Sequence, residues 1–172
     1  MRALLDRLFD AAGHLAGLFM VGTLLAVLLS IAGRFVEALA VPGVDAYAGY
    51  SMAASAFLAL APTLRRGEHI RVTLLFNHLP APAQRALDIA CHLAAVVLGG
   101  ALAWFSLRLV LQSREFNDIS TGLDATPLWI PQLGMALGTA LFALAYLSDL
   151  VALLRGQSLR ETGPDAEPAR IE

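Results

Sequence analysis

The chain has 172 residues, of which 58% are hydrophobic and only 15% charged, and its mean hydropathy is +0.66. Soluble domains usually have about 45–50% apolar and about 25% charged residues, so this composition argues against a water-soluble globular domain. The net charge is −2, and the twelve basic residues are all arginines near the ends of apolar segments, so no nucleic-acid partner is expected.

Four long stretches contain no Asp, Glu, Lys or Arg, and they predict four membrane-spanning helices. A helix needs about 20 apolar residues, each rising about 1.5 Å, to cross a hydrocarbon core about 30 Å thick. We therefore predict an all-α polytopic membrane protein. Its transmembrane domain covers residues 1–155, with spans at about 11–33, 46–64, 89–107 and 125–148.

The first stretch is interpreted as a retained helix. Arg2 and Arg7 precede it and small residues lie near its end, as in a secretory signal. Its apolar run is, however, longer than the 7–15 residues of a signal core. It also contains Gly13 and Gly17 at a GxxxG spacing, which allows two helix backbones to approach closely.

The connection between the second and third stretches predicts a further, short helix. Apolar residues at i, i+3, i+4 and i+7 form one face of a helix; here they are Val72, Leu75, Phe76 and Leu79. Because arginines accompany this face, we expect an amphipathic helix lying in the membrane interface. A Leu-Pro pair then ends it, and Pro82 can open the third span.

The fourth span has a recognisable start. Thr126 is expected to cap the helix and Pro127 to lie in its first turn. Pro131 implies either that the helix begins near Ile130 or that it is kinked there. Further along the same span, a second GxxxG spacing offers another smooth packing face; its members are Gly134 and Gly138.

The distribution of arginines predicts the orientation. Nine of the twelve fall on the side that holds both termini and the second connection. Cytoplasmic segments carry an excess of Arg and Lys, so both termini are expected in the cytoplasm. The tail, residues 156–172, is rich in Pro, acidic residues and Arg and is predicted to be disordered.

The spans lack the groups that carry transport chemistry or catalysis. A charged residue in a span costs at least about 2.5–3.5 kcal/mol and usually marks an ion path, and no Asp, Glu, Lys or Arg lies within the four stretches. Cys91 has no partner for a disulfide or a zinc site, and no Ser/His/Asp or HExxH pattern occurs. We therefore expect a subunit rather than an autonomous pump or an enzyme, with no metal and no cofactor.

One alternative from another class stays open. His14 and His92 each lie early in a span that starts on the same side of the membrane. Two such histidines on facing helices could ligate a b-type haem in an electron-transfer subunit. Two single histidines without a supporting motif are more often neutral, hydrogen-bonded residues.

Two sequence motifs resemble a known family. Residues 63–72 read Thr-Leu-Arg-Arg-Gly-Glu-His-Ile-Arg-Val, with a Leu-Pro pair at residues 79–80. Residues 121–124 (Thr-Gly-Leu-Asp) lead into residues 127–132 (Pro-Leu-Trp-Ile-Pro-Gln). Together they resemble the small membrane subunit of tripartite ATP-independent periplasmic (TRAP) transporters, the DctQ-type family.

The resemblance implies a small permease subunit in the bacterial inner membrane. In such systems a periplasmic solute-binding protein captures an organic acid, often a carboxylate. A large membrane subunit moves it by symport with an ion, and the small subunit packs against the large one. A four-helix unit without charged residues in its spans is suited to bracing such a moving partner.

The resemblance also directs attention to two groups of residues. The first is an inner-face group expected to hold membrane lipids or an acidic edge of the large subunit: Arg65, Arg66, Gly67, His69, Ile70 and Arg71. The second is expected to fix the outer entry of the fourth helix rather than to touch solute: Pro127, Trp129 and Pro131.

Overall fold

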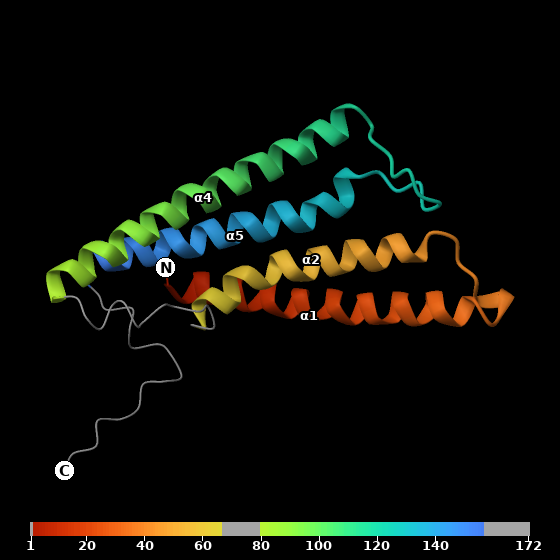
Figure 1. The fold of residues 1–172 in the computed structure, drawn as a ribbon, viewed down its shortest axis with the longest axis horizontal. Coiled ribbons are helices and arrows are strands. Elements are labelled where there is room, and N and C mark those ends of the chain that lie inside the picture. Colours follow the sequence, from red (N-terminus) through yellow and green to blue (C-terminus); the bar gives the residue numbers. More distant parts are fainter. Residues whose placement is uncertain (1, 67–79, 157–172) are drawn as a thin grey trace, which may run out of the picture.

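In the computed structural model, which describes residues 2–66 and 80–156, the chain folds into four long helices (Figure 1). These are α1 (Arg2–Gly33), α2 (Val44–Arg65), α4 (Ala81–Glu115) and α5 (Trp129–Leu154), with a short 3-10 helix, η1 (Glu37–Leu39), after α1. Within these ranges the extended backbone is limited to one isolated bridge between Ile119 and Pro127. The predicted all-α fold class is confirmed.

The helices lie side by side in the order α1, α2, α5, α4, and successive helices in this row contact each other extensively (Figure 1). The bundle has two ends, which we name the terminal end and the loop end. The terminal end holds the start of α1, the end of α2, the start of α4 and the end of α5. The loop end holds the connections at residues 34–43 and 116–128.

Three of the described helices are long and apolar enough to cross a membrane, namely α1, α4 and α5. The 22-residue α2 is not among them. Two helices extend well beyond the predicted spans, since α1 begins at Arg2 and α4 runs from Ala81 to Glu115. The reason is that charged residues end a hydrocarbon-compatible segment but not a helix, because a helix satisfies its own backbone in water as well.

The starts of α4 and α5 show how local sequence sets helix boundaries. Pro82 is the second residue of α4, where a missing N–H costs nothing. The expected cap at Thr126 is wrong, because α5 begins only at Trp129 and its N-cap, Leu128, makes no side-chain cap. Pro131 is therefore the third residue of α5, again among the N–H groups that have no helical partner.

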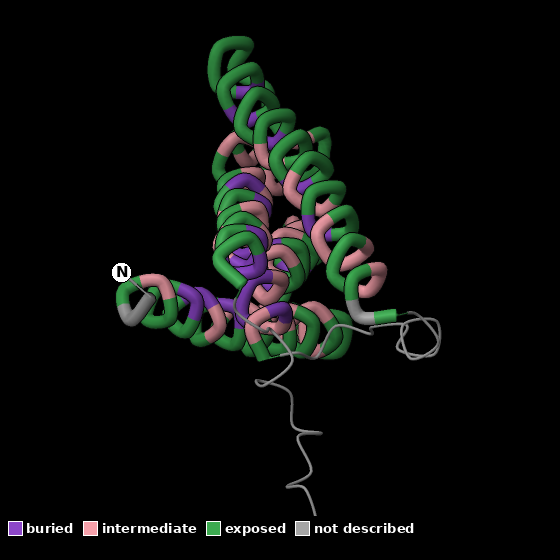
Figure 2. The backbone as a smooth tube through the Cα atoms, turned by 90° about the vertical axis from the view of Figure 1, so that its left-hand side faces the viewer, coloured by how far each residue is buried: buried purple, intermediate pink, exposed green. Residues whose placement is uncertain are grey.

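The interior of the bundle is built mainly from small residues. Buried positions form short patches along the helices, while exposed residues cover most of the chain trace (Figure 2). The main core cluster lies toward the terminal end and consists of Phe9, Ala61, Leu64 and Ala145. Thr139 is fully buried, and its hydroxyl donates to the carbonyl of Met135 one turn earlier (2.9 Å), so no polar group is left unpaired there.

Candidate partner interface

Helix α2 lies between α1 and α5 and leaves one side open. Toward α1, the buried Ser55 hydroxyl donates to the carbonyl of Ala16 (2.8 Å). Toward α5, Ala54 and Phe57 lie against glycines of that helix. The open side carries exposed small residues at a spacing of four and three, which places them on one helix face: Gly49, Ala53 and Ala56. We call this surface the α2 face.

The α2 face differs from the outer surfaces of the other helices. Exposed large apolar side chains line α1, α4 and α5, as expected for surfaces that meet lipid tails. In α2, only Tyr47 and Met52 are exposed large apolar residues. Met52 lies on this open side, three residues after Gly49 and four before Ala56, while the members of the α2 face around it are small. A second helix could therefore approach the backbone of α2 closely beside Met52.

The side of α2 that faces α5 shows such a close approach within the chain. A Cβ atom added at Gly134 would lie 2.7 Å from the Cβ of Ala54. One added at Gly138 would overlap the backbone of Phe57. The backbones of α2 and α5 are thus in direct contact, and we call this contact the α2–α5 seam. The GxxxG pair in α1 is packed less tightly. A Cβ atom added at Gly13 would lie 3.5 Å from the side chain of Pro62, and one added at Gly17 would have no neighbour within 4 Å.

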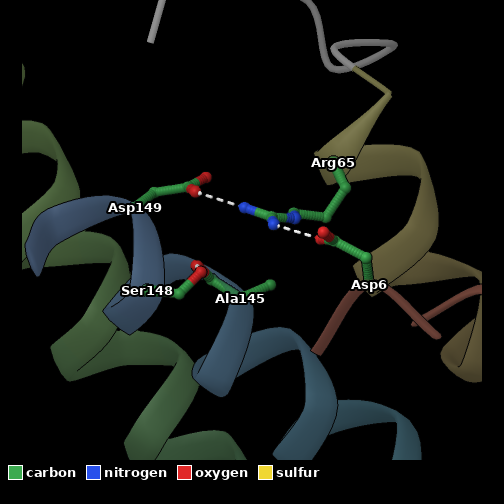
Figure 3. A network of polar contacts seen from close by, with 5 residues as sticks. All are labelled: Asp6, Arg65, Ala145, Ser148 and Asp149. Carbon is green, nitrogen blue, oxygen red and sulfur yellow. Dashed lines mark hydrogen bonds and ion pairs between the residues drawn. The ribbon is translucent and has the colours of Figure 1, made fainter. Parts of the chain in front are cut away.

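An ionic cluster closes the terminal end (Figure 3). The guanidinium of Arg65 donates to Asp149 in α5 (3.1 Å) and to Asp6 in α1 (2.5 Å). It also lies over the ring of Phe9, 5.5 Å from the centroid. The Asp149 side chain is only 8% exposed, whereas Arg65 is 28% and Asp6 52% exposed. Arg65 thus connects three helices. The buried Asp149 depends on this pairing more than the half-exposed Asp6 does, because its charge has less contact with solvent.

A hydrogen-bonded cluster closes the loop end around Asp124. The carboxylate accepts hydrogen bonds from the Ser120 hydroxyl (2.8 Å), the Tyr50 hydroxyl (3.0 Å) and the Thr126 backbone N–H (3.4 Å). Gly43 has φ +78°, and an added Cβ would lie 2.7 Å from the backbone N of Asp124. The start of α2 is therefore fixed against the connection that precedes α5.

The environment of Asp124 favours its ionised form. Desolvation acts to raise the pKa of this carboxyl group, but the hydrogen bonds from Ser120, Thr126 and Tyr50 outweigh it. They lower the pKa from 3.8 to about 2. Asp124 is thus a permanent anion at physiological pH. A neighbouring hydrogen bond from Thr126 to the hydroxyl of Tyr47 (3.0 Å) extends the same cluster.

The inner-face group predicted from the sequence is described only in part. Arg65 lies in the ionic cluster, so its guanidinium is used within the chain. Arg66 is exposed at the end of α2. The remaining four members, Gly67, His69, Ile70 and Arg71, lie outside the described residues. The expected amphipathic helix and the tail from residue 157 onward lie outside them as well.

The residues at the entry of α5 are held at the loop end. Trp129 is the first residue of α5, and the guanidinium of Arg114 lies 5.7 Å from its ring centroid. Pro127 pairs with Ile119 in the isolated bridge, and Pro131 is in the first turn of the helix. This arrangement joins the end of α4 to the start of α5.

The two histidines of the haem alternative do not face each other. His14 is in α1 and His92 in α4, which lie at opposite sides of the row of helices (Figure 1). Each Nδ1 lies 2.8 Å from a carbonyl one turn earlier, that of Asp10 or Asp88. The ring of His92 meets Tyr146 edge-on at 5.9 Å. The helix order thus gives no support to a shared haem.

Sequence reasoning missed the acidic partners in both clusters. Asp149 lies one residue past the predicted fourth span, at the end of the bundle that also holds Arg65. The sequence places Arg65 and Asp149 at the same end of the bundle, but it does not show that the second and fourth spans are neighbours. Asp124 was noted only as part of a motif, and its contact with Tyr50 joins residues 74 positions apart, which no local pattern reveals.

Comparison with known proteins gives a family match over most of the chain. The sequence pattern of "Tripartite ATP-independent periplasmic transporters, DctQ component" matches residues 23–156, from the second half of α1 to the end of α5. The chain is also similar to the isethionate TRAP transporter permease protein DctMQ of Oleidesulfovibrio alaskensis, with 27% identity over 99 residues. That match covers 58% of this chain but only 15% of the relative. The chain therefore belongs to the DctQ component family of TRAP transporters, a family of membrane transporter subunits, as its two motifs predicted.

Proposed function

We propose that this chain is the small permease subunit of a TRAP-type secondary transporter in the bacterial inner membrane. In this proposal it braces a large membrane subunit during ion-gradient-driven uptake of an organic acid that a periplasmic binding protein delivers. The family match supports the subunit assignment. The related permease is named for isethionate, a small organic acid, which supports this class of solute. Two parts of the proposal rest on the sequence resemblance alone, namely that the solute is a carboxylate and that an ion gradient drives its uptake.

We further propose that α2 is a fourth span. Its 22 residues correspond to about 33 Å of helix, which matches a hydrocarbon core of about 30 Å. Its many alanines, its glycine and its Ser, Thr and Tyr residues leave α2 with fewer large apolar side chains than the other three helices. Because α2 runs antiparallel to α1 and parallel to α5 and contacts both, it would cross the bilayer with them (Figure 1).

The terminal end is proposed to face the cytoplasm. The structure brings both ends of the described chain to that end (Figure 1). It also gathers there most of the arginines with described side chains, which favours the cytoplasmic side; they are Arg7, Arg65, Arg66, Arg85 and Arg155. Arg66, together with His69 and Arg71 outside the described residues, is proposed to meet lipid phosphates or the large subunit on that side.

The observation that carries the bracing role is the α2 face. Lipid tails provide no hydrophobic drive for helix association, so membrane helices pack through small residues that permit close contact. The α2 face has this character, and Met52 is the one large apolar residue exposed on that side of the helix. In the related DctMQ protein, the similar segment is part of a much longer permease polypeptide. We therefore place the large subunit against the α2 face.

The test is recovery of the large subunit with tagged variants of the α2 face. The double variant Ala53→Leu, Ala56→Leu adds bulk at two exposed positions, and leucine keeps a high helix propensity there. We expect recovery of the large subunit to fall at least tenfold, while the amount and melting temperature of the chain itself stay unchanged.

The matched control is Ala101→Leu, which adds the same bulk at an exposed position of α4. It should leave recovery of the large subunit at the wild-type level. Wild-type recovery with the α2 double variant, or an equal loss with the α4 control, would contradict this placement of the interface.

A further inference from the structure

The connection between α1 and α2 exposes large apolar side chains outside the predicted spans. Among the described residues, Phe35 is the most exposed large apolar residue, at 84%. Three further large apolar residues of this connection are exposed, namely Val36, Leu39 and Val41. Contiguous apolar surface of this kind usually marks a contact with another molecule or with a membrane. We call residues 34–41, which include η1, the α1–α2 turn.

The α1–α2 turn is held close to the end of α1. It leaves the helix after Gly33 and returns to it, since a Cβ added at Gly33 would lie 3.0 Å from the carbonyl oxygen of Leu39 and 3.0 Å from the Cα of Ala40. The Ser30 hydroxyl also donates to the carboxylate of Asp45 in the first turn of α2 (2.5 Å), which joins the two helix ends. The turn therefore stays near the depth at which α1 ends.

That depth corresponds to the boundary of a bilayer. The charge-free part of α1, residues 11–33, is about 34 Å of helix, compared with a hydrocarbon core about 30 Å thick. Most backbone N–H groups of the turn also donate to carbonyls of the chain; they are those of Arg34, Phe35, Val36, Leu39 and Ala40. A segment whose N–H groups are paired internally can lie at a lipid boundary at little cost.

Phe35 continues the outer surface of α1. Four exposed residues follow each other at spacings of four, three and four, which places them on one helix face: Leu24, Leu28, Ile31 and Phe35. The Val36 N–H donates to the carbonyl of Ala32 (2.9 Å), a helical bond that extends this course past the end of α1. Among the described elements, α1 contacts only α2 and η1 extensively. Its outer face is thus the side that lipid tails would cover.

We propose that the α1–α2 turn is a membrane anchor, with the side chains of Phe35 and Leu39 among the acyl chains of the leaflet at the loop end. Glu37 faces water in this proposal, because residues two apart in a 3-10 helix point in different directions. The proposal rests on the membrane placement in the proposed function. It depends neither on the partner of the α2 face nor on which side of the membrane holds the loop end.

The experiment uses single cysteines in the full chain with Cys91→Ala, placed in phospholipid nanodiscs without any other subunit. A charged maleimide reacts with the thiolate, which forms readily only in contact with water. We expect Phe35→Cys and Leu39→Cys to react at least about tenfold more slowly than the matched control Glu37→Cys. The three rates should become equal in sodium dodecyl sulfate, which removes the bilayer.

A nitroxide attached at residue 35 provides a second readout. Its collisions with oxygen, which concentrates in lipid, should exceed those with a water-soluble nickel chelate, and a nitroxide at Glu37 should show the reverse. Leu25→Cys, at an exposed position in the middle of α1, serves as the reference for a fully lipid-covered site.

Three results would overturn the proposal. If Phe35→Cys reacts as fast as Glu37→Cys while Leu25→Cys stays protected, the turn lies in water although α1 spans the bilayer. Protection of Phe35→Cys that appears only after the large subunit is added would assign the turn to a protein contact. Rapid reaction of Leu25→Cys would remove the membrane placement itself. Should Phe35→Cys fail to fold, Leu39→Cys decides the matter.

Discussion

Gly138 sets the distance between α2 and α5 because its hydrogen faces the backbone of Phe57. A side chain at this position would have to displace a helix backbone, which cannot be done by rotating a neighbouring side chain. Gly17, on the outer part of α1, meets nothing within 4 Å. The two glycines share the same GxxxG pattern but have different surroundings, so their substitution should have opposite consequences.

Gly138→Ala is expected to destabilise the bundle by about 1–3 kcal/mol, the usual cost of overpacking a tight contact. Thermal unfolding in mild detergent measures this as a lower melting temperature. Gly17→Ala should be neutral or stabilise by up to about 1 kcal/mol, because alanine is the better helix former. Equal melting temperatures for the two variants would show that the α2–α5 seam is looser than described.

Asp124 gives the loop end a defined dependence on pH. Its pKa in the folded state, about 2, lies below the ordinary 3.8. A lowered pKa contributes stability above the ordinary value and loses it as the pH falls through the folded value. Asp124→Asn should therefore lower the melting temperature at pH 7, and its difference from the wild type should shrink between pH 4 and pH 2.

The control for this prediction is Glu115→Gln, which removes an exposed carboxylate at the end of α4. It should shift the melting temperature little at any pH in the series. A difference between Asp124→Asn and the wild type that stays constant down to pH 2 would mean that ionisation of Asp124 does not support the loop-end cluster.

At the scale of elements, one polar residue joins α2 to both of its neighbours at the terminal end. Arg65 reaches both neighbouring helices, and Asp149 is almost fully buried beside it. Removing one partner of a buried ion pair leaves an uncompensated charge, which is far more costly than losing an exposed pair. The two carboxylates should therefore respond differently to mutation.

Arg65→Met is expected to destabilise the protein by about 3 kcal/mol, because it leaves Asp149 buried and unpaired. Asp6→Asn should cost about 1 kcal/mol or less, since Asp6 is half exposed. The measurement is thermal unfolding of both variants, and the double variant Arg65→Met, Asp149→Asn should recover part of the loss. An equal effect of Arg65→Met and Asp6→Asn would contradict the importance of burial.

The helices themselves were largely predictable, because charge-free stretches of about 20 residues have few alternatives to a helix in a bilayer. Their ends were not, since Arg2 and Glu115 lie outside any apolar segment and still belong to helices. The start of α5 was misplaced for another reason. The chain continues through Pro127 and Leu128 before α5 begins, and the hydroxyl of Thr126 donates instead to the hydroxyl of Tyr47 in α2, a long-range contact that no local pattern reveals.

The contacts between helices could be predicted only as possibilities. GxxxG spacing identified four glycines, but only the structure shows that Gly134 and Gly138 meet another backbone. Arg65 was noticed for its place in a motif, while Asp6 and Asp149 were not, because pairing across three helices depends on their order in space. Which helices are neighbours is information that a single sequence does not contain.

For the whole molecule, the central expectation is that the four long helices cross the membrane in alternating directions. Single cysteines in a Cys91→Ala background test it when introduced at four exposed sites: Glu37, Arg66, Asn117 and Arg155. A membrane-impermeant maleimide should label intact cells, with the outer membrane permeabilised, at the first and third sites. The second and fourth should react only after lysis.

Two other patterns are informative. Labelling of the first two sites from the same side would mean that α2 does not cross the bilayer. A complete reversal of the pattern would leave four crossings in place but put both termini outside, against the distribution of arginines.

The α2–α5 seam has a thermodynamic consequence. Glycine and alanine have no side-chain rotamers to lose, so forming this contact orders only the backbone. Leucine or methionine at the same positions would lose rotational freedom whenever the helices met. Heating should therefore weaken this seam less than contacts made by long side chains, so that α2 and α5 stay paired when the outer helices begin to separate.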